Sequence, residues 1–349
     1  MRARKTIVYA LCHMLTDFCC AYFMFSAVFN GGTWDMAALL YNFCGFALQM
    51  PLGLLADRLN QNWLVAAVGC VFVAVAFLMG GALIPASVIL GLGNALFHVG
   101  GGVDILNVSG KTAGILGIFV SPGALGIYFG TVLGKSAILP WFLPVIFMIW
   151  SALLIALTCR GRGKSRGSSH NAPVSFPAVG EGAYFEAVLL FLVVCLRSYM
   201  GTIFSFSWKT GVWPLLFVCG VALGKAAGGF LSDWIGPLQA SVVSLGASAV
   251  LFLFSNDAVC GTLAVFLFNM TMPITLSAVA DVFPGAKGFS FGLLTFALFF
   301  GFAASWLGVA GFGSEIIYAL GALVSLALLI PGVHYSERCQ GSTLRGSHK

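Results

Sequence analysis

Apolar residues fall into twelve runs of roughly 20 positions, and charged or Gly- and Pro-rich stretches separate the runs. A helix of about 20 apolar residues is long enough to cross the hydrocarbon core of a bilayer. Hydrophobic residues make up 60% of the 349 and charged residues only 8%, which excludes a soluble globular protein of this length. We therefore predict an all-α integral membrane protein with twelve transmembrane helices, approximately over residues 7–29, 34–55, 63–82, 86–108, 112–134, 140–159, 184–207, 213–231, 239–255, 259–280, 288–308 and 314–332.

The basic residues predict how the chain is oriented. If the N-terminus lies inside, 13 of the 17 Lys and Arg residues face the cytoplasm, and only Lys135 and Lys209 face outside. Cytoplasmic loops of membrane proteins carry an excess of Lys and Arg, so we expect both termini in the cytoplasm and the chain in the cytoplasmic (inner) membrane. The net charge of +6 then reflects topology, and we expect membrane lipid around a monomer and no nucleic acid partner.

A basic segment rich in Gly, Ser and Pro divides the twelve runs into two groups of six. We expect this segment to be a cytoplasmic linker between two helical bundles. The predicted boundaries are 1–159 for the N-terminal six-helix bundle, 160–183 for the linker, 184–333 for the C-terminal six-helix bundle and 334–349 for a cytoplasmic tail.

The second group of runs repeats the first. Equivalent residues differ by a nearly constant offset, 176 for Asp57 and Asp233 and 175 for Asn94 and Asn269. Each half has an even number of spans, so both halves have the same orientation in the membrane. This arrangement predicts two pseudo-symmetric bundles with a substrate cavity between them.

The loop after the second run carries the most specific motif. In PLGLLADRLN, Gly53, Asp57 and Arg58 match the pattern G-x-x-x-D-R-x-G-R-R that the major facilitator superfamily favours at this place. The copy after the eighth run, GGFLSDWIGP, keeps Asp233. The chain resembles this superfamily over essentially its whole length. The resemblance implies the major facilitator fold, in which the two bundles rock about a central site.

Within the superfamily, the chain is most similar to the fosmidomycin-resistance type of drug exporter. The shared features are His13-x-x-x-Asp17 in the first helix, GLGNALFH ending at His98 in the fourth, and Leu-Arg-Ser around Arg197 in the seventh. The chain departs from that group after His98, where Val-Gly replaces Pro-Glu.

Four residues are candidates for gating. The resemblance implies that Asp57 faces the N-terminus of the eleventh helix and Asp233 the N-terminus of the fifth, where the helix dipole attracts a carboxylate. Such contacts would hold the cytoplasmic side shut, although a simple capping role is the alternative. Arg58 and Asp104, near the same surface, complete the predicted gating set.

His13 and Asp17 are polar residues in an apolar run, four positions apart and therefore on one helix face. Asp17 lies roughly 16 Å along the helix, near the midplane of the membrane. A carboxylate there is costly and usually functional. In the superfamily's arrangement this face lines the cavity, together with helix 4 and His98. We predict a proton-coupling site of Asp17, His13 and His98; a neutral carboxyl group bonded to His13 in a structural role is the alternative.

Arg197 has a depth similar to that of Asp17 in the opposite bundle. A guanidinium keeps its proton, so it needs an anion, either Asp17 or a substrate. We predict that Arg197 binds substrate, and that Lys225 does the same unless it reaches the cytoplasmic surface instead. The polar residues of the fourth and tenth helices complete the predicted substrate-binding set: Asn94, Asn269, Thr271 and Thr275.

Glycines recur every four residues in the predicted fifth helix, from Gly126 to Gly134, and in the eighth, from Gly220 to Gly228. Each trio lies on one face and permits close backbone approach. In the superfamily's arrangement these two helices meet across the interface between the bundles; packing against a neighbouring helix of the same bundle is the alternative.

Three transport hypotheses follow. The first is a proton-coupled secondary transporter, an antiporter that exports a small organic molecule. The second is uptake or exchange of an organic anion, with Arg197 and Lys225 as counter-charges. The third, transport of a divalent metal by Asp17, His13 and His98, has the least support because the sequence contains no dense ligand cluster.

A receptor or scaffold without transport is a further alternative. The chain lacks Walker, nucleophile-elbow and H-E-x-x-H motifs, so we expect no primary pump, no enzyme, no cofactor and no metal site.

Overall fold

The helices of the computed structural model match the apolar runs of the sequence. The structure describes residues 2–29, 31–159, 171–177, 182–307 and 313–346, and these contain helices and no β-strand. Among these residues, ten helices, some with a short break, are long and apolar enough to cross a membrane, and Asn62–Leu78 and Pro237–Phe252 are two shorter apolar helices. The ten long and two shorter helices lie where the twelve spans were predicted.

The first six spans form one group of helices. Its elements are α1 (Arg2–Phe23), the π-helix η1 (Met24–Val28), α2 (Trp34–Asn42), the π-helix η2 (Phe43–Ala47), α3 (Gln49–Leu59), α4 (Asn62–Leu78), α5 (Leu83–Ser109), α6 (Ala113–Val120), α7 (Pro122–Ser136) and α8 (Phe142–Cys159). The second group consists of α9 (Ala183–Ile203), α10 (Trp213–Ile235), α11 (Pro237–Phe252), α12 (Ala258–Asn269), α13 (Thr271–Val282), α14 (Lys287–Trp306) and α15 (Glu315–Gly346). The segment predicted as a tail from residue 334 is thus helical as far as Gly346.

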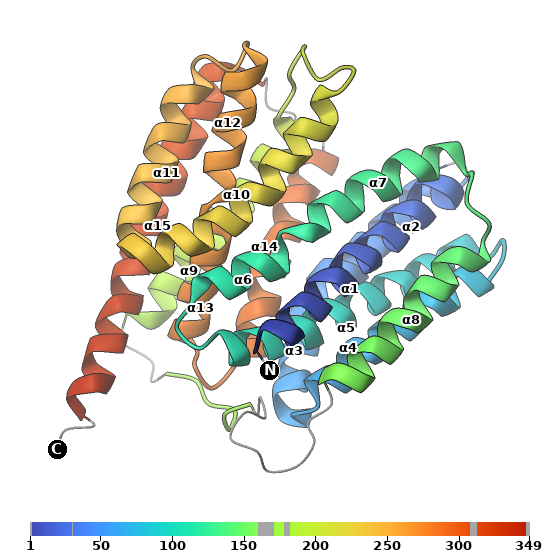
Figure 1. Ribbon diagram of the computed structural model, residues 1–349, viewed down its shortest axis with the longest axis horizontal. Coiled ribbons are helices and arrows are strands. Elements are labelled where there is room, and N and C mark those ends of the chain that lie inside the picture. The colour runs from blue at the N-terminus through green and yellow to red at the C-terminus, as the bar shows by residue number, and fades with distance from the viewer. Residues whose placement is uncertain (1, 30, 160–170, 178–181, 308–312, 347–349) are drawn as a thin grey trace.

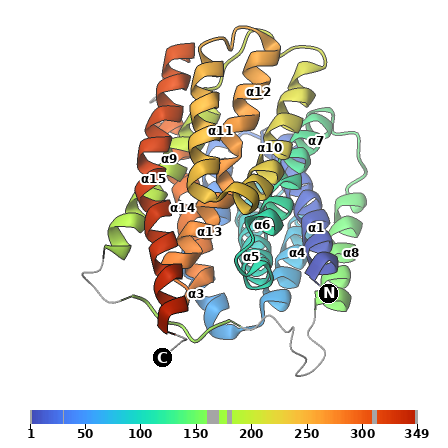
Figure 2. The same ribbon diagram turned by 60° about the vertical axis from the view of Figure 1, so that its left-hand side comes forward.

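The two groups are two bundles that lie side by side and diverge away from the end where both chain termini lie (Figure 1; Figure 2). They touch mainly through α3 against α14 and α6 against α10. Large apolar side chains such as Leu157, Leu223 and Leu153 are exposed on the outside of the bundles, as expected where lipid covers a protein. The exact bundle boundaries stay a prediction, because most of the predicted linker lies outside the described residues.

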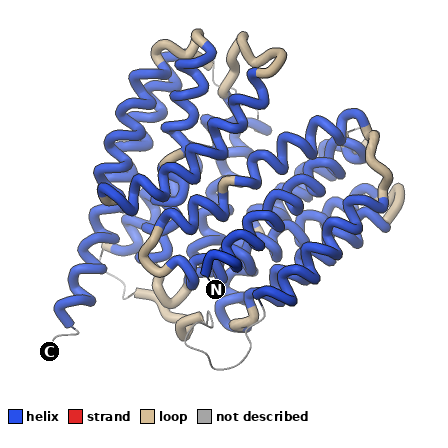
Figure 3. The backbone as a smooth tube through the Cα atoms, viewed as in Figure 1, coloured by secondary structure: helices blue, strands red, loops and turns tan. Residues whose placement is uncertain are grey.

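The fifth and tenth spans are each divided midway into two α-helices, as the backbone trace shows (Figure 3). Proline explains both breaks, since its ring removes an N–H and clashes with the carbonyl group four residues earlier. Pro122 ends α6 and starts α7, and Pro273 disturbs the carbonyl of Asn269, where α12 gives way to α13. The breaks leave carbonyl groups without helical partners, and those of α6 matter for the site described below.

The interface between the bundles depends on glycines other than the two predicted trios. A Cβ atom on Gly53 would clash with the backbone of Gly288, and one on Gly229 with the backbone of Ala113. The trio from Gly126 to Gly134 instead packs on α1, and the trio from Gly220 to Gly228 packs on α12 and its junction with α13. The interface role of the trios was therefore a wrong prediction, and packing within each bundle is the observed arrangement.

The described part of the linker, residues 171–177, bridges the two bundles. The Asn171 side chain donates to the carbonyl groups of Ala56 and Asp57 at 3.0 and 3.3 Å and accepts from Asn62 and Asn107 at 2.8 and 2.7 Å. At its other end, the Ser175 N–H donates to the Gly285 carbonyl group at 3.2 Å in the second bundle. The side-chain hydrogen bonds of Asn171 and the backbone hydrogen bond of Ser175 thus hold the linker across the end where the bundles meet.

Replacement of Asn171 by Ala should release this segment, because the five hydrogen bonds of its side chain are lost. We expect faster amide hydrogen exchange over residues 171–177 than in the unaltered protein. Ser175→Ala is the matched control, since its hydrogen bond uses the backbone N–H and survives the change. Equal exchange in the two variants would show that Asn171 does not anchor the linker.

Candidate functional site

A cavity of about 280 Å³ lies between the bundles. It draws its lining from both bundles, and most of the predicted proton-coupling and substrate-binding residues contribute to it. These are His13, Asp17, Asn94, His98, Arg197, Lys225, Asn269 and Thr275. Thr271 accepts a hydrogen bond from Arg197. The structure therefore brings together residues that are up to 262 positions apart in the chain (275 − 13 = 262).

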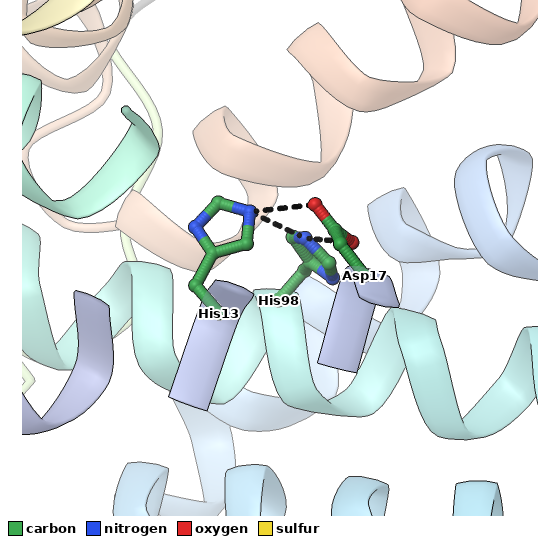
Figure 4. A group of neighbouring side chains, drawn as sticks. All are labelled: His13, Asp17 and His98. Atoms are coloured by element: carbon green, nitrogen blue, oxygen red, sulfur yellow. Dashed lines mark hydrogen bonds and ion pairs between the residues drawn. The ribbon is translucent and has the colours of Figure 1, made fainter. Parts of the chain in front are cut away.

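His13, Asp17 and His98 form a compact cluster on one wall of the cavity (Figure 4). The two Nε2 atoms are 3.0 Å apart, and they lie 3.2 Å (His13) and 3.4 Å (His98) from the two carboxylate oxygens of Asp17. The cluster is mostly buried, with His13 6% and Asp17 9% exposed. Sequence spacing predicted the His13–Asp17 pair, and α5 adds His98 to it.

Backbone carbonyl groups fix the tautomer of both rings. His13 Nδ1 lies 2.7 Å from the Phe119 carbonyl oxygen, and His98 Nδ1 lies 2.9 Å from that of Asn94. A carbonyl oxygen only accepts, so each Nδ1 carries the hydrogen and each Nε2 of a neutral ring offers a lone pair. Three acceptors therefore converge, and the cluster needs at least one further cation, either a proton or a metal ion.

Arg197 and Lys225 bring two positive charges to the same cavity. Arg197 Nη2 donates to the hydroxyl groups of Thr271 and Thr275 at 2.8 and 3.2 Å. Lys225 Nζ donates to the Val120 carbonyl oxygen at 3.5 Å. Among the residues that the structure describes, no carboxylate lies within 4.0 Å of either cation. The Arg197–Asp17 ion pair, one of the two predicted alternatives, is therefore not present.

The break after α6 explains how two of these side chains are held. The carbonyl groups of Phe119 and Val120 have no helical partner because α6 ends at Val120. They accept from His13 and Lys225 instead. Lys225 consequently points into the cavity, and the alternative that it reaches the cytoplasmic surface is wrong.

Sequence reasoning missed Gln49 as a polar group of the cavity, whereas it predicted Asn94. Gln49 Oε1 is buried without a hydrogen-bond partner in the described part of the chain, and so is the side-chain oxygen of Asn94. Tyr41 accepts from the Asn94 amide through its hydroxyl oxygen at 3.2 Å. The repeat carried a signal for Gln49, since it is the equivalent of Lys225 at the offset of 176 (225 − 49 = 176).

Asp57 and Asp233 occupy equivalent places at the closed end of the cavity. The oxygens of Asp57 accept from the N–H groups of Gly288 and Phe289 in the first turn of α14, at 2.8 and 3.0 Å. Those of Asp233 accept from Ala113 and Gly114 at the start of α6, at 2.7 and 2.9 Å. Each carboxylate thus ties one bundle to the other through unpaired helix N–H groups.

The other two predicted gating residues have different surroundings. Asp104 is 2% exposed and accepts from Lys5 Nζ at 3.2 Å and from the Tyr9 hydroxyl at 3.0 Å. Both partners belong to α1, so these contacts stay within the first bundle. Arg58 is exposed at the end of α3. A gating role for Asp104 and Arg58 stays a prediction.

Comparisons with known proteins establish the fold. No protein-family profile and no curated sequence matches the chain. The chain is similar to the solved structure of the major facilitator superfamily transporter FucP in its outward conformation, with a TM-score of 0.66, 14% identity, and coverage of 94% of this chain and 98% of that one. It is also similar to the human organic anion transporter MFSD10 (TETRAN), with a TM-score of 0.71, 15% identity, and coverage of 94% and 99%.

A third similar structure is a bacterial homologue of the iron transporter ferroportin in an outward-facing state, with a TM-score of 0.60, 15% identity, and coverage of 97% and 99%. Together these similarities confirm the predicted fold, which is the all-α major facilitator fold. They do not confirm the resemblance to the fosmidomycin-resistance type of drug exporter.

Asp57→Asn should weaken the closed state, because a neutral amide accepts more weakly from the α14 N–H groups than a carboxylate does. We expect longer distances between spin labels at Gln61 and Gln239, two exposed positions on different bundles, by double electron–electron resonance. A loss of ~1–3 kcal/mol would change the ratio of open to closed molecules by roughly 5- to 150-fold. Asp35→Asn, in the first turn of α2, is the control. Identical distance distributions for both variants would remove the gating role of Asp57.

Proposed function

We propose that this chain is a secondary transporter that moves a small organic anion across the membrane by alternating access. One observation carries the proposal. Arg197 and Lys225 both line the central cavity, and no described carboxylate lies within 4.0 Å of either.

The charge of the cavity supports an anionic substrate over a neutral or cationic one. Arg197 and Lys225 contribute two positive charges, Asp17 contributes one negative charge, and the cluster around Asp17 calls for a further cation. Burial of an unpaired charge is unfavourable, so an incoming carboxylate or phosphonate would relieve this arrangement. Such a ligand also suits the planar fork of a guanidinium, which has five N–H donors.

The donors of Arg197 remain available to such a ligand. Only Nη2 has hydrogen-bond partners among the described residues, and these are the two threonine hydroxyls of α13. The hydroxyls fix the plane of the guanidinium, which reduces the entropy lost when a ligand binds. Thr271 and Thr275 therefore fit a positioning role, and Asn94 and Gln49 offer acceptors for polar groups of the same ligand.

Alternating access is supported by the shape of the interface. The bundles meet at the end that carries the chain termini, where Asp57 and Asp233 hold them together, and diverge at the other end (Figure 1). The distribution of Lys and Arg supports a cytoplasmic location for the closed end. The described conformation is then the outward-facing member of a cycle in which these contacts break.

The fold itself does not select the substrate. Among the similar structures, one protein is described as a fucose:proton symporter from E. coli, one as an organic anion transporter and one as a homologue of an iron transporter. All are transporters, in agreement with the expectation that the chain is not an enzyme. The cavity residues favour the organic-anion hypothesis over export of a drug of other charge. Export itself, and proton coupling at Asp17, His13 and His98, stay predictions.

Transport by proteoliposomes tests the proposal. The uptake assay uses a panel of small carboxylates and phosphonates with the corresponding amides and amines. We expect uptake of the anionic compounds only. Arg197→Gln and Lys225→Met should each weaken apparent affinity, by about 10- to 150-fold, because a charged hydrogen bond contributes roughly 1.5–3 kcal/mol. Lys135→Met, at an exposed site away from the cavity, should leave uptake unchanged. Uptake of the amines or amides, or full uptake of the anions by Arg197→Gln, would contradict the proposed transport of an organic anion.

A further inference from the structure

We propose that His13, Asp17 and His98 bind one divalent transition-metal ion. This site is separate from the anion-binding residues Arg197 and Lys225, and the proposal goes beyond the transport of an anion. It concerns the nature of the cation that the cluster requires. Four features of the cluster support it: the direction of the lone pairs, the distances between them, the chemistry of the donors and the free space beside them.

The first feature is the orientation of the two imidazole rings. Each ring gives its Nδ1 hydrogen to a backbone carbonyl oxygen, at 2.7 Å for His13 and 2.9 Å for His98. A histidine that ligates a metal through Nε2 commonly donates its other N–H to a carbonyl or carboxylate in this way, which fixes the tautomer and the ring plane. Both Nε2 lone pairs therefore point into the cluster, toward Asp17 (Figure 4).

The distances between the ligand atoms are those of a coordination polyhedron. The three separations are 3.0, 3.2 and 3.4 Å. Ligands about 2.1 Å from a metal are about 3.0 Å apart at the edge of an octahedron and about 3.4 Å apart at the edge of a tetrahedron. A single proton lies on one atom and serves at most two of the three contacts, which leaves two lone pairs facing each other. One metal ion would satisfy all three contacts together.

The donor set identifies the class of metal. Two imidazoles and one carboxylate suit first-row transition metals such as Zn²⁺, Fe²⁺ and Mn²⁺, whereas Mg²⁺ and Ca²⁺ prefer oxygen ligands alone. Three protein ligands leave coordination positions open, and all three line the cavity. A glycine lies beside them, because a Cβ atom on Gly123 would clash with Asp17 Oδ2 and His13 Nε2. Gly123 thus places no side chain in the space next to these two ligand atoms.

The neighbouring charges predict how the site would behave. Lys225 is close enough to Asp17 and His98 to interact with them electrostatically, and Tyr41 and Cys20 are the other titratable groups near Asp17. A divalent ion would be repelled by Lys225, and an anion beside Lys225 and Arg197 would relieve that repulsion. Metal and anion should therefore strengthen the binding of each other, as linkage requires.

Isothermal titration of the purified full-length chain, without a polyhistidine tag and after treatment with a chelator, tests the proposal. We expect one ZnCl₂ site per chain, MnCl₂ at the same site, and no saturable binding of MgCl₂. His98→Ala and Asp17→Asn should each weaken Zn²⁺ binding by about 100-fold, since each removes one of three ligands. His334→Ala, at an exposed position of α15, is the control and should bind as the unaltered chain does.

Two further variants separate this site from the proposed anion site. Lys225→Met should bind Zn²⁺ more tightly, roughly fivefold or more, because a like charge is removed, although its anion transport is impaired. Gly123→Ala should bind Zn²⁺ weakly because its methyl group occupies the space beside the ligands. A general loss of folding would instead weaken binding in every variant, and melting temperatures recorded in parallel reveal it.

X-ray absorption at the zinc edge of the unaltered chain gives a result that needs no variant. The proposal predicts two imidazole ligands and otherwise oxygen. Absence of saturable Zn²⁺ binding, a first shell without two imidazoles, or equal affinity in His98→Ala and His334→Ala would each overturn it. The first of these outcomes would leave a proton as the cation of the cluster.

Discussion

A charge in the apolar interior of a membrane protein needs a partner inside the protein, because lipid hydrocarbon cannot solvate it and bulk water does not reach it. Three carboxylates of the described residues have such partners within the protein. Asp57 and Asp233 use the N–H groups at two helix starts, and Asp104 uses Lys5 and Tyr9. These contacts position α3 against α14, α10 against α6 and α1 against α5, so the closed end of the molecule follows from them.

The cavity is the place where this internal pairing stops. Arg197 and Lys225 have only hydroxyl and carbonyl partners among the described residues, and His13, Asp17 and His98 present lone pairs to one another. The repeat makes the difference visible. The two halves carry the same residue, Asp57 and Asp233, at the closed end, where each accepts from helix N–H groups of the other bundle. In the cavity they differ, with Gln49 in one half and Lys225 at the equivalent position of the other, as the proposed binding of an asymmetric ligand would require.

Local patterns predicted the parts of this structure that depend on local physics. Run length predicted the helical spans, and the resemblance to the major facilitator superfamily implied the helix ends that Asp57 and Asp233 contact. Contacts that depend on how whole helices pack could not be predicted from local patterns. The meeting of His98 with His13 requires the packing of α5 on α1, which only the resemblance to the superfamily implied, and the spacing of the glycine trios did not show which neighbour they face. Asn171 carried no signal, because an asparagine in a Gly- and Ser-rich segment is common.

Under the proposed function, Arg197 is kept for a ligand, whereas the paired charges hold the fold together. Thermal unfolding of two variants without any ligand distinguishes these two roles. Loss of one partner from a buried ion pair typically costs ~3–5 kcal/mol, so Asp104→Asn should unfold at a clearly lower temperature. Arg197→Gln removes a charge that no described carboxylate balances, and it should unfold at the same temperature as the unaltered chain or a higher one. A melting temperature for Arg197→Gln as low as that of Asp104→Asn would contradict the account.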